Sequence, residues 1–211
     1  MKIKNKSLSD KSKKWLKRHL KDEFVKKSKL ERYRSRAAYK LLEIDKKYNL
    51  LKSCSSAVDL GAAPGSWSEV LLEKLNSPRK IIAIDLLEVK SLKNVQIIKG
   101  DFTSTDFANT LQKDGPFDLF LSDASPNLIG NKTADFLQSL ELIENIFDIA
   151  LKNLSTGGHF VAKYFRSGDI NDLLSKAKKN FEKVTSFKPD SSRKESSEIY
   201  LICLKKKKPV D

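Results

Sequence analysis

Three aspartates stand where their carboxylates could bind a nucleoside. Asp85 and Asp123 each follow an apolar, β-rich stretch, and Asp101 follows another within Gly100-Asp101-Phe102. Because ligands of open α/β sheets bind beyond the carboxyl ends of the strands, we expect these carboxylates to meet at one edge. An acid after the second strand suits ribose hydroxyls, and one after the third suits the exocyclic amine of adenine. A single aspartate could be a cap or turn residue, but three at one edge predict a nucleoside pocket.

A glycine loop lies before these aspartates, between a predicted strand and a predicted helix. Residues 59–67 read DLGAAPGSW, with a Gly-x-x-x-Gly spacing from Gly61 to Gly65. This differs from the Gly-x-Gly-x-x-Gly fingerprint of dinucleotide sites. Glycine is needed where the backbone approaches a ligand, although a tight turn without a ligand is the alternative for the loop alone. Loop and acids together indicate a nucleoside pocket with no obvious cation for a phosphate, which is the shape of S-adenosylmethionine.

A lysine at the end of another apolar stretch is a further candidate for chemistry. Lys163 ends the stretch 159–163, and Asp123 follows the stretch 117–121. A lysine in such a place is costly to bury unless it is paired. If the two strands are neighbours, Asp123 can be its partner. The pattern indicates either a functional lysine or a plain buried ion pair.

The elements that must position these residues alternate along the chain after residue 52. The β-rich stretches are 57–60, 81–85, 95–98, 117–121 and 159–163, and the helical ones are 67–75, 106–112 and 133–154. This alternation predicts βαβ units and a parallel sheet covered on both faces. Two more strands, 183–187 and 199–204, are joined by a turn at 189–192 without a helix, so they must be antiparallel. We expect a terminal hairpin added to a parallel sheet.

Basic charge is concentrated near the N-terminus. The 211 residues include 41 Lys and Arg and 27 Asp and Glu, a net charge of +14. Residues 1–52 hold 19 basic and 6 acidic residues, or +13, while the rest of the chain holds 22 and 21. Helical patterns cover 15–24 and 35–48 in this region. Such charge attracts a phosphate backbone through counterion release, although a solubilising lysine-rich surface is the alternative.

Composition disfavours several classes of protein. With 39% hydrophobic and 32% charged residues, the chain is expected to form one globular domain. No stretch reaches about 18 apolar residues, so we expect no membrane span, and the charged N-terminus is unlike a secretory signal. Cys54 and Cys203 are far apart and have no histidine cluster, so we expect neither a zinc site nor a disulfide framework. A reducing, cytoplasmic setting fits best.

Motifs along nearly the whole chain carry a resemblance to a known family. They are RSRAAYKL at 34–41, DLGAAPGSW at 59–67, DLL at 85–87, GDF at 100–102, SDASPN at 122–127, Lys163, KPDSSR at 188–193 and SEIY at 197–200. In these motifs the chain resembles the FtsJ/RrmJ family of ribose 2′-O-methyltransferases, over roughly residues 12–204.

The resemblance implies an α/β, Rossmann-like fold that depends on S-adenosylmethionine. The expected sheet has seven mostly parallel strands and an antiparallel C-terminal hairpin, with helices on both faces and a basic N-terminal helical extension. The implied organisation is an extension at 1–52 that carries Lys40, a methyltransferase domain at 53–204 and a lysine-rich tail at 205–211.

The resemblance also implies a catalytic tetrad of Lys40, Asp123, Lys163 and Glu198, with Lys163 as the proton acceptor. A ribose hydroxyl is a poor nucleophile until its proton begins to leave, so a base must lie within hydrogen-bond reach. Because both acids favour a charged lysine, we expect deprotonation only once bound RNA excludes water. No metal is expected.

By the same matching, S-adenosylmethionine is placed beside ten residues. They are Gly61, Ala62, Pro64, Gly65, Trp67, Asp85, Leu86, Asp101, Phe102 and Asp123. Ser66 departs from the family pattern, since the bacterial ribosomal enzyme has a second glycine there. A small residue is expected to fit.

For the substrate, the resemblance implies a uridine in the A loop of 23S ribosomal RNA, on the assembled or nearly assembled large subunit. The predicted RNA contacts are Arg32, Arg34, Arg36 and Arg193, and Tyr200 or Trp15 is considered as an exposed aromatic for base stacking. The alternatives are a transfer-RNA 2′-O-methyltransferase and a catalytically silent, RNA-binding ribosome-assembly factor. A nicotinamide-dependent oxidoreductase is disfavoured by the glycine spacing. We expect a monomer.

Overall fold

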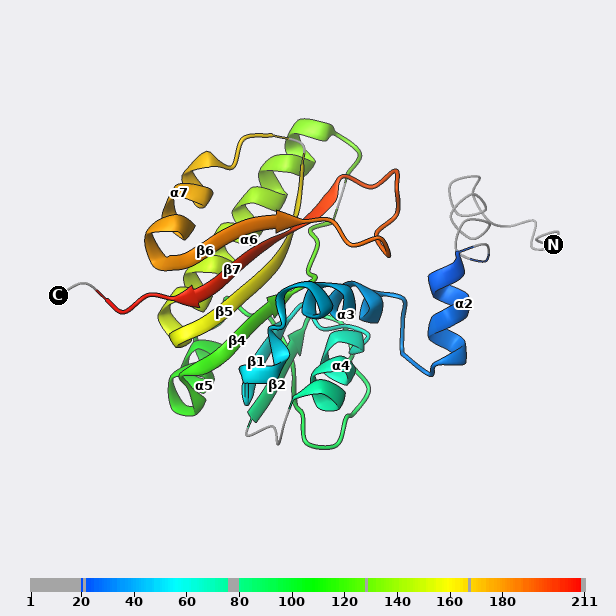
Figure 1. Cartoon of the computed structure of the whole chain (residues 1–211), viewed down its shortest axis with the longest axis horizontal. Coiled ribbons are helices and arrows are strands. Elements are labelled where there is room, and N and C mark those ends of the chain that lie inside the picture. The colour runs from blue at the N-terminus through cyan, green and yellow to red at the C-terminus, as the bar shows by residue number, and fades with distance from the viewer. Residues whose placement is uncertain (1–19, 21, 76–79, 128, 167, 210–211) are drawn as a thin grey trace.

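The protein is built on one seven-stranded sheet (Figure 1). The computed structural model describes residues 20, 22–75, 80–127, 129–166 and 168–209. The strands follow the spatial order β3-β2-β1-β4-β5-β7-β6. Their bounds are β1 Ser56–Leu60, β2 Lys80–Asp85, β3 Gln96–Lys99, β4 Phe117–Ser122, β5 Leu154–Phe165, β6 Phe181–Phe187 and β7 Glu198–Lys206.

The first five strands are parallel and the last two form an antiparallel hairpin. β1 lies between β2 and β4, and parallel pairing continues to β3 on one side and to β5 on the other. β7 is antiparallel to both β5 and β6. The predicted mostly parallel sheet with a terminal hairpin is confirmed, and each of the seven predicted strands overlaps an observed one.

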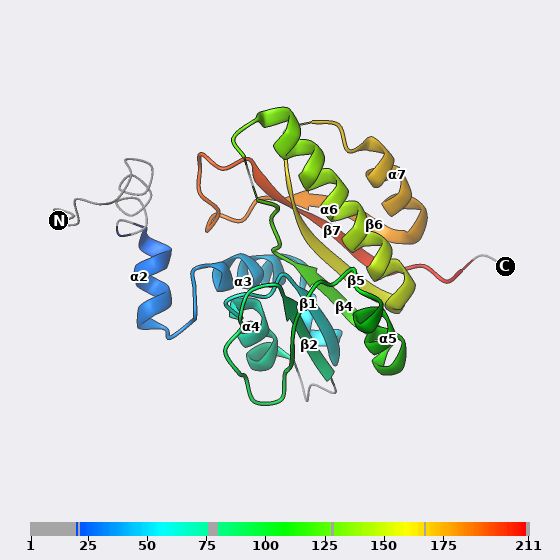
Figure 2. The same cartoon turned by 180° about the vertical axis from the view of Figure 1, so that it is seen from behind.

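Helices cover both faces of the sheet (Figures 1 and 2). Their bounds are α2 Glu23–Leu30, α3 Ala37–Tyr48, α4 Ser66–Lys74, α5 Thr105–Asp114, α6 Lys132–Asn153 and α7 Asn171–Asn180, with a 3₁₀ turn, η1, at Leu51–Ser53. The apolar side chains of α3 and α4 pack on one face, and those of α5, α6 and α7 pack on the other. Among the helices that the structure describes, none is long and apolar enough to cross a bilayer.

Strand side chains alternate between two apolar cores. Val58 and Leu60 of β1 face the core under α5, α6 and α7, whereas Ala57 faces the core under α3 and α4. All five residues of β1 are buried, as expected for a central strand of a parallel sheet covered on both sides.

Helix α3 joins the basic N-terminal region to the second of these cores. Ala38, Leu41 and Ile44 are spaced at i, i+3 and i+6, and each is 0% exposed. They belong to the same apolar cluster as the sheet residues Leu121 and Ile202. This packing fixes the helix that carries Lys40 against the sheet.

Helix α7 was not predicted by the sequence analysis, which names no helix between the strands expected at 159–163 and 183–187. The segment NDLLSKAKKN contains few apolar residues, so its helical period is weak. Leu173 and Ala177 are nevertheless buried at i, i+4 spacing, with Asp172 in the first turn and two lysines in the last. This spacing and the charges at the two ends were the sequence features that could have predicted the helix.

The predicted N-terminal helix and lysine-rich tail also have different bounds in the structure. Residues 15–19 and 21 of the predicted helix, among them the stacking candidate Trp15, lie outside the described residues, and α2 begins only at Glu23. β7 continues to Lys206, so two lysines of the predicted tail belong to the strand. The Lys206 ammonium donates to the carbonyl oxygens of Leu151 and Leu154 at 2.6 and 2.7 Å, so this lysine is bound to the end of α6 and the start of β5.

Candidate active site

Four elements bring the predicted tetrad together. Asp123 follows β4 directly, Lys163 lies in β5, Glu198 begins β7 and Lys40 belongs to α3. β5 pairs with β7 so that Lys163 lies opposite Tyr200. Because β7 is antiparallel, its first residue comes to the edge where β4 and β5 end. A parallel strand would have placed Glu198 at the opposite edge.

Asp123 is the centre of the tetrad. Its Oδ2 lies 3.2 Å from Lys40 Nζ, and its Oδ1 lies 3.3 Å from Lys163 Nζ. Lys40 Nζ also lies 3.1 Å from Glu198 Oε1. Lys163 Nζ donates in addition to the backbone carbonyl oxygen of Asp123 at 2.7 Å. Each ammonium is therefore held by oxygens from two different groups.

The four charged side chains are largely shielded from water. Their exposed fractions range from 9% for Lys163 to 18% for Asp123. Two cations and two anions balance one another, which is the condition under which charges are kept in a protein interior. A hydroxyl group that entered here would meet donors and acceptors whose positions are already set.

Tyr200 is a fifth member of the site that the sequence analysis assigned to another role. Its hydroxyl donates to Asp123 Oδ1 at 2.7 Å, and the Lys40 ammonium lies 5.6 Å from its ring centroid. The side chain is fully buried, so the suggestion of an exposed stacking platform is wrong for this residue. The available signal was its place two residues after Glu198, which puts both side chains on one face of the strand.

The surroundings of Asp123 favour its charged form. Burial by itself would raise the pKa of this carboxyl, but the ammonium groups of Lys40 and Lys163 and the hydroxyl of Tyr200 outweigh it and lower the pKa below its ordinary value. Burial, together with the charges of Asp123 and Glu198, raises the pKa of Tyr200 well above its ordinary value. At neutral pH, Asp123 is therefore a carboxylate and Tyr200 a hydrogen-bond donor.

A cavity of about 570 Å³ lies on one side of the tetrad. It is lined by Gly61, Ala63, Asp85, Leu86, Leu87, Asp101, Phe102, Thr103, Asp123, Ala124, Ser125, Pro126, Asn127, Leu142 and Asn145. The three aspartates meet here, as the strand ends predict. Of the predicted cofactor residues, those on the wall are Gly61, Asp85, Leu86, Asp101, Phe102 and Asp123.

Backbone amides orient two of these carboxylates. Asp85 accepts hydrogen bonds from the amide of Ala63 at 2.9 Å and from that of Leu87 at 2.8 Å. Asp101 accepts one from the amide of Thr103 at 2.8 Å. Because a carboxylate can accept about four hydrogen bonds, both groups can still receive donors from a ligand.

The other predicted cofactor residues, Ala62, Pro64, Gly65 and Trp67, are not among those that line the cavity. Trp67 is 2% exposed, and its indole N–H donates to the carbonyl oxygen of Ala37 at 2.8 Å, so its ring belongs to the core beside α3. Gly65 is the N-cap of α4 with a φ of 103°, a value that favours glycine. These residues shape the loop behind the wall.

A second cavity, of about 430 Å³, lies beside the other half of the tetrad. It is lined by Arg36, Ala37, Lys40, Arg193, Glu195, Ser196 and Glu198. Asp123 thus borders the first cavity, while Lys40 and Glu198 border the second. The sequence analysis assigned no role to Ala37, Glu195 or Ser196; their closeness in sequence to Arg36 and Glu198 was the only signal.

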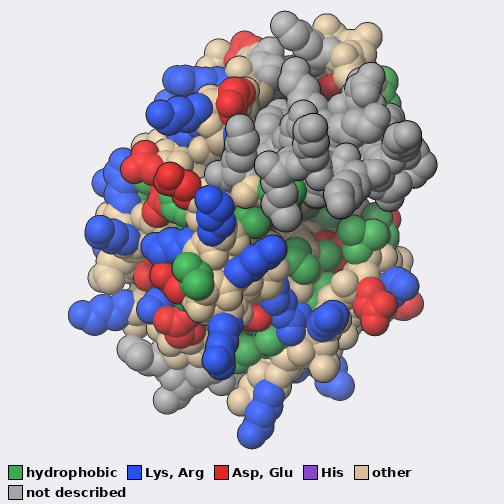
Figure 3. Space-filling model, turned by 90° about the vertical axis from the view of Figure 1, so that its right-hand side faces the viewer, with side chains coloured by type: hydrophobic (Ala, Val, Ile, Leu, Met, Phe, Trp, Pro, Cys, Tyr) green, Lys and Arg blue, Asp and Glu red, His purple; other side chains and the backbone are tan. Residues whose placement is uncertain are grey.

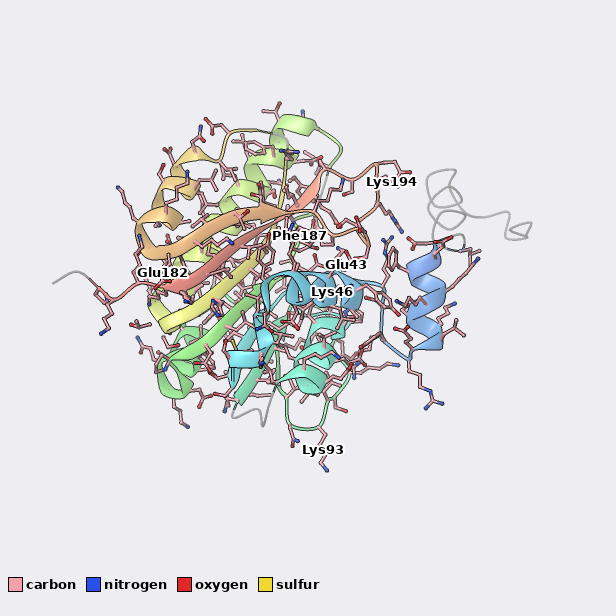
Figure 4. All side chains as sticks on the ribbon, in the orientation of Figure 1. Glu43, Lys46, Lys93, Glu182, Phe187 and Lys194 are labelled. Atoms are coloured by element: carbon pink, nitrogen blue, oxygen red, sulfur yellow. The ribbon has the colours of Figure 1, made fainter. Side chains whose placement is uncertain are left out.

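The loop after β6 closes the second cavity against α3. The amide of Ser191 donates to the carboxylate of Glu43 at 3.1 Å, and Figure 4 shows Glu43 on α3 below the loop that carries Lys194. The Arg36 guanidinium donates to the carbonyl oxygen of Ser191. One wall of this cavity therefore comes from the hairpin and the other from the N-terminal region.

The predicted RNA-binding arginines have different surroundings. Arg32 is exposed, and Arg193 lines the second cavity with its Nε 3.5 Å from Asp22 Oδ2. Arg36 also lines that cavity but forms an ion pair with Asp22. Arg34 faces the protein rather than solvent, because its guanidinium is bound by Glu69 and by backbone carbonyl groups. The face near α2 carries many lysine and arginine side chains with acidic ones between them (Figure 3).

No metal centre is evident in the part of the chain that the structure describes. Within it, no three His, Cys, Asp or Glu side chains gather closely enough to hold an ion. Cys54 and Cys203 are buried free thiols.

The first cavity has the chemistry that S-adenosylmethionine requires. Its wall combines three carboxylates with apolar side chains such as Leu86 and Phe102, and among the residues that the structure describes no lysine or arginine lines it. Acidic walls suit the hydroxyl and amine donors of adenosine and the positive sulfonium, whereas they would repel a phosphate chain. The volume lies within the range of about 300 to 1,000 Å³ that is typical of small-molecule sites.

Comparison with known proteins agrees with this chemistry. The FtsJ-like methyltransferase family matches residues 33–206. The ribosomal RNA large subunit methyltransferase E of Rickettsia rickettsii is 46% identical over 200 residues, which cover 92% of this chain and 88% of that protein. The protein of the same name from Novosphingobium aromaticivorans is 47% identical over 193 residues, covering 90% and 86%. 

A solved structure shows the same relationship. The crystal structure of a ribosomal RNA methyltransferase from Plasmodium falciparum has a TM-score of 0.72 and 36% sequence identity, and the match covers 82% of this chain and 98% of that one. Family match, sequence identity and fold therefore agree over most of the length. The chain belongs to the FtsJ-like methyltransferase family, whose methyl donor is S-adenosylmethionine.

Proposed function

We propose that this protein transfers the methyl group of S-adenosylmethionine to a ribose 2′-hydroxyl of ribosomal RNA, and that the target is a uridine in the A loop of the 23S RNA of the large subunit. The observation that carries the reaction type is the tetrad between two cavities. One cavity fits the cofactor, and the other, lined by Arg36 and Arg193, is open to an acceptor.

The two lysines and two acids would act on the acceptor hydroxyl. Lys163 Nζ is held by the carbonyl and carboxylate oxygens of Asp123, which lines the cofactor cavity, although Lys163 itself is not among the lining residues of either cavity. From there it can bind the 2′-hydroxyl and accept its proton once RNA excludes water. Lys40, fixed by Asp123 and Glu198, would hold the same ribose oxygen from the other cavity.

Alignment would supply much of the acceleration. When bound, S-adenosylmethionine supplies an electrophilic methyl group on sulfur, and methyl transfer requires the attacking oxygen in line with the carbon–sulfur bond. Side chains that are buried and doubly held keep the hydroxyl in that orientation. The role assigned to this chain is therefore to orient the hydroxyl and to receive one proton.

The relatives support ribosomal RNA as the substrate class. Two proteins that are 46% and 47% identical to this chain over the matched residues are named as methyltransferases of large-subunit ribosomal RNA. Their matches cover at least 86% of each relative, so the acceptor side is compared as well as the cofactor side. The uridine and its place in the A loop rest on the family resemblance in the motifs given above.

The test uses purified protein, methyl-labelled S-adenosylmethionine and three RNA substrates: large ribosomal subunits, naked ribosomal RNA and transfer RNA. We expect label on a 2′-O-methyluridine of the large-subunit RNA. Lys163→Arg should lose at least about 100-fold in turnover, because it keeps the charge but changes the geometry and cannot accept the proton. The matched control is Lys176→Ala on α7, which removes an exposed lysine and should keep wild-type turnover.

Each outcome decides a different part of the proposal. Label on transfer RNA alone would contradict the ribosomal substrate but keep the chemistry. Label on a base rather than a ribose would contradict the 2′-hydroxyl as acceptor. Near-normal turnover by Lys163→Arg would contradict its role as the proton acceptor.

A further inference from the structure

Arg34 connects two loops at the rim of the cofactor cavity. Its Nη1 donates to the carbonyl oxygen of Pro64 at 3.0 Å and to that of Lys90 at 2.7 Å. Its Nη2 donates to the carbonyl oxygen of Ser91 at 3.0 Å. Pro64 belongs to the loop after β1, whereas Lys90 and Ser91 belong to residues 86–95 between β2 and β3, which we call the rim loop. One guanidinium therefore bridges loops from two neighbouring strands.

Both bridged loops supply the wall of the cavity. Gly61 and Ala63 line it from the loop after β1, and Leu86 and Leu87 line it from the rim loop. Asp85 already ties these segments on the cavity side, through the amides of Ala63 and Leu87. Arg34 is a second tie, from the loop after β1 to the middle of the rim loop, in which Lys93 is labelled in Figure 4.

Arg34 is itself held in place by Glu69 of α4. The Arg34 amide donates to Glu69 Oε2 at 2.9 Å, and its Nε donates to Glu69 Oε1 at 3.0 Å. With one bond from Nε, two from Nη1 and one from Nη2, four of the five guanidinium N–H groups have partners within the protein. The side chain is 17% exposed. Little of it is left to bind an RNA phosphate.

The glycine at position 65 makes this arrangement possible. A Cβ atom there would lie 2.7 Å from Arg34 Nη1 and 3.1 Å from Val89 Cγ1 of the rim loop. The first distance is shorter than real Cβ contacts and the second is tighter than most, so a side chain here would displace the Arg34 guanidinium and crowd the rim loop, whereas glycine lets both lie against the start of α4. The sequence analysis assigned Gly65 to cofactor binding and Arg34 to RNA binding. In the structure the two residues lie against each other.

We propose that Arg34 is a positioning residue for the S-adenosylmethionine site, which holds the rim loop against the loop after β1. Its loss would let the rim loop move away and would weaken cofactor binding. A lysine cannot replace it, because one ammonium on a flexible stem cannot reach three carbonyl groups and a carboxylate in the geometry of the planar fork.

The test measures cofactor binding without RNA. Calorimetric titration of S-adenosylmethionine should give a Kd about tenfold higher for Arg34→Lys and for Arg34→Ala than for the wild type. The matched control is Arg32→Ala, which removes the same charge from an exposed position two residues earlier and should leave the cofactor Kd within about twofold. In Arg34→Lys, the amides of the rim loop should exchange hydrogen faster, while those of β3 should not.

An unchanged cofactor Kd in Arg34→Lys would contradict the proposal, and so would an equal rise in Arg32→Ala, which would show an effect of charge alone. If the Arg34 variants do not fold, the Glu69→Gln variant tests the proposal instead. It keeps the arginine but weakens the ion pair that holds the guanidinium in place. A Kd raised about threefold in Glu69→Gln, with a thermal midpoint near that of the wild type, supports the proposal, and an unchanged Kd contradicts it.

Discussion

Asp59 is a buried acid beneath the edge of the sheet that carries the site. It is 1% exposed in β1, and the hydroxyl of Ser68 donates to its Oδ2 at 2.7 Å. Burial raises the pKa of Asp59 from 3.8 to about 7, with contributions from the charges of Asp123 and Asp85 and against the Ser68 hydrogen bond. This carboxyl is therefore neutral in mildly acidic solution and becomes charged around neutrality.

Asp59 should make the protein less stable as pH rises. Its pKa is higher in the folded protein than in the unfolded chain, so the folded state binds the proton more tightly. The stabilisation is complete below the unfolded pKa of 3.8 and is lost as pH rises to about 7. Between pH 5 and 8, the free energy of unfolding of Asp59→Asn should therefore gain about 2 kcal/mol relative to that of the wild type.

Urea unfolding at a series of pH values measures this difference. Asp106→Asn is the control, because Asp106 is an exposed aspartate in the first turn of α5. If the free energies of unfolding of the wild type and Asp59→Asn differ by a constant amount from pH 5 to 8, the raised pKa of Asp59 is contradicted.

At the scale of elements, one aspartate joins α2 to both walls of the second cavity. Asp22 is the N-cap of α2, where its carboxylate accepts hydrogen bonds from the amides of Phe24 and Val25. The same carboxylate forms ion pairs with Arg36 and with Arg193. We infer from these contacts, and from the packing of α3 on the sheet, that the basic N-terminal region is an extension of the methyltransferase domain.

Two substitutions at Asp22 separate its roles. Asp22→Asn keeps a good N-cap but removes the charge, whereas Asp22→Ala removes both. We expect Asp22→Ala to be about 1 kcal/mol less stable than Asp22→Asn, and both to be less stable than the wild type because two partly buried guanidinium groups lose their partner. Urea unfolding gives the stabilities, and hydrogen exchange in α2 shows whether the helix frays. Equal stability of all three proteins would contradict this role.

At the scale of the whole molecule, the net charge of +14 is distributed unevenly. The exposed basic residues Lys26, Lys29 and Arg32 lie on and just after α2. The N-cap of this helix, Asp22, pairs with two arginines that line the second cavity. Helix α7 lies elsewhere and also carries exposed lysines. If RNA approaches through the second cavity, only the first group should contact its phosphates.

The salt dependence of RNA binding tests this asymmetry. Replacing Lys26, Lys29 and Arg32 together by alanine should lower the slope of log K against log salt by about 2, the value for three phosphate contacts on a single strand. The control replaces Lys176, Lys178 and Lys179 of α7, which removes the same charge. An equal change of slope in both variants would indicate a general effect of net charge rather than a binding face.

Much of the fold could be predicted from the sequence, because its strands are short apolar runs with carboxylates at their ends. That pattern placed Asp85, Asp101 and Asp123 at one edge of a parallel sheet, and the structure has them on one cavity wall. Helix α7 escaped prediction because its buried side is narrow. The buried residues of this helix are Leu173 and Ala177, and two apolar positions among polar residues give only a weak helical pattern.

The predicted tetrad was named by family resemblance, but its distances, its two flanking cavities and the place of Tyr200 came only from the tertiary structure. Lys40 and Glu198 are 158 positions apart in the chain. Only the packing of α3 and the antiparallel return of β7 bring them to 3.1 Å. Arg34 shows the same limit, because no local pattern distinguishes an arginine bound to backbone carbonyl groups from one open to a phosphate. The sequence by itself determined which groups could do chemistry, and long-range packing decided which of them meet. The reason is that contacts between distant segments produce no periodic pattern of residues within either segment.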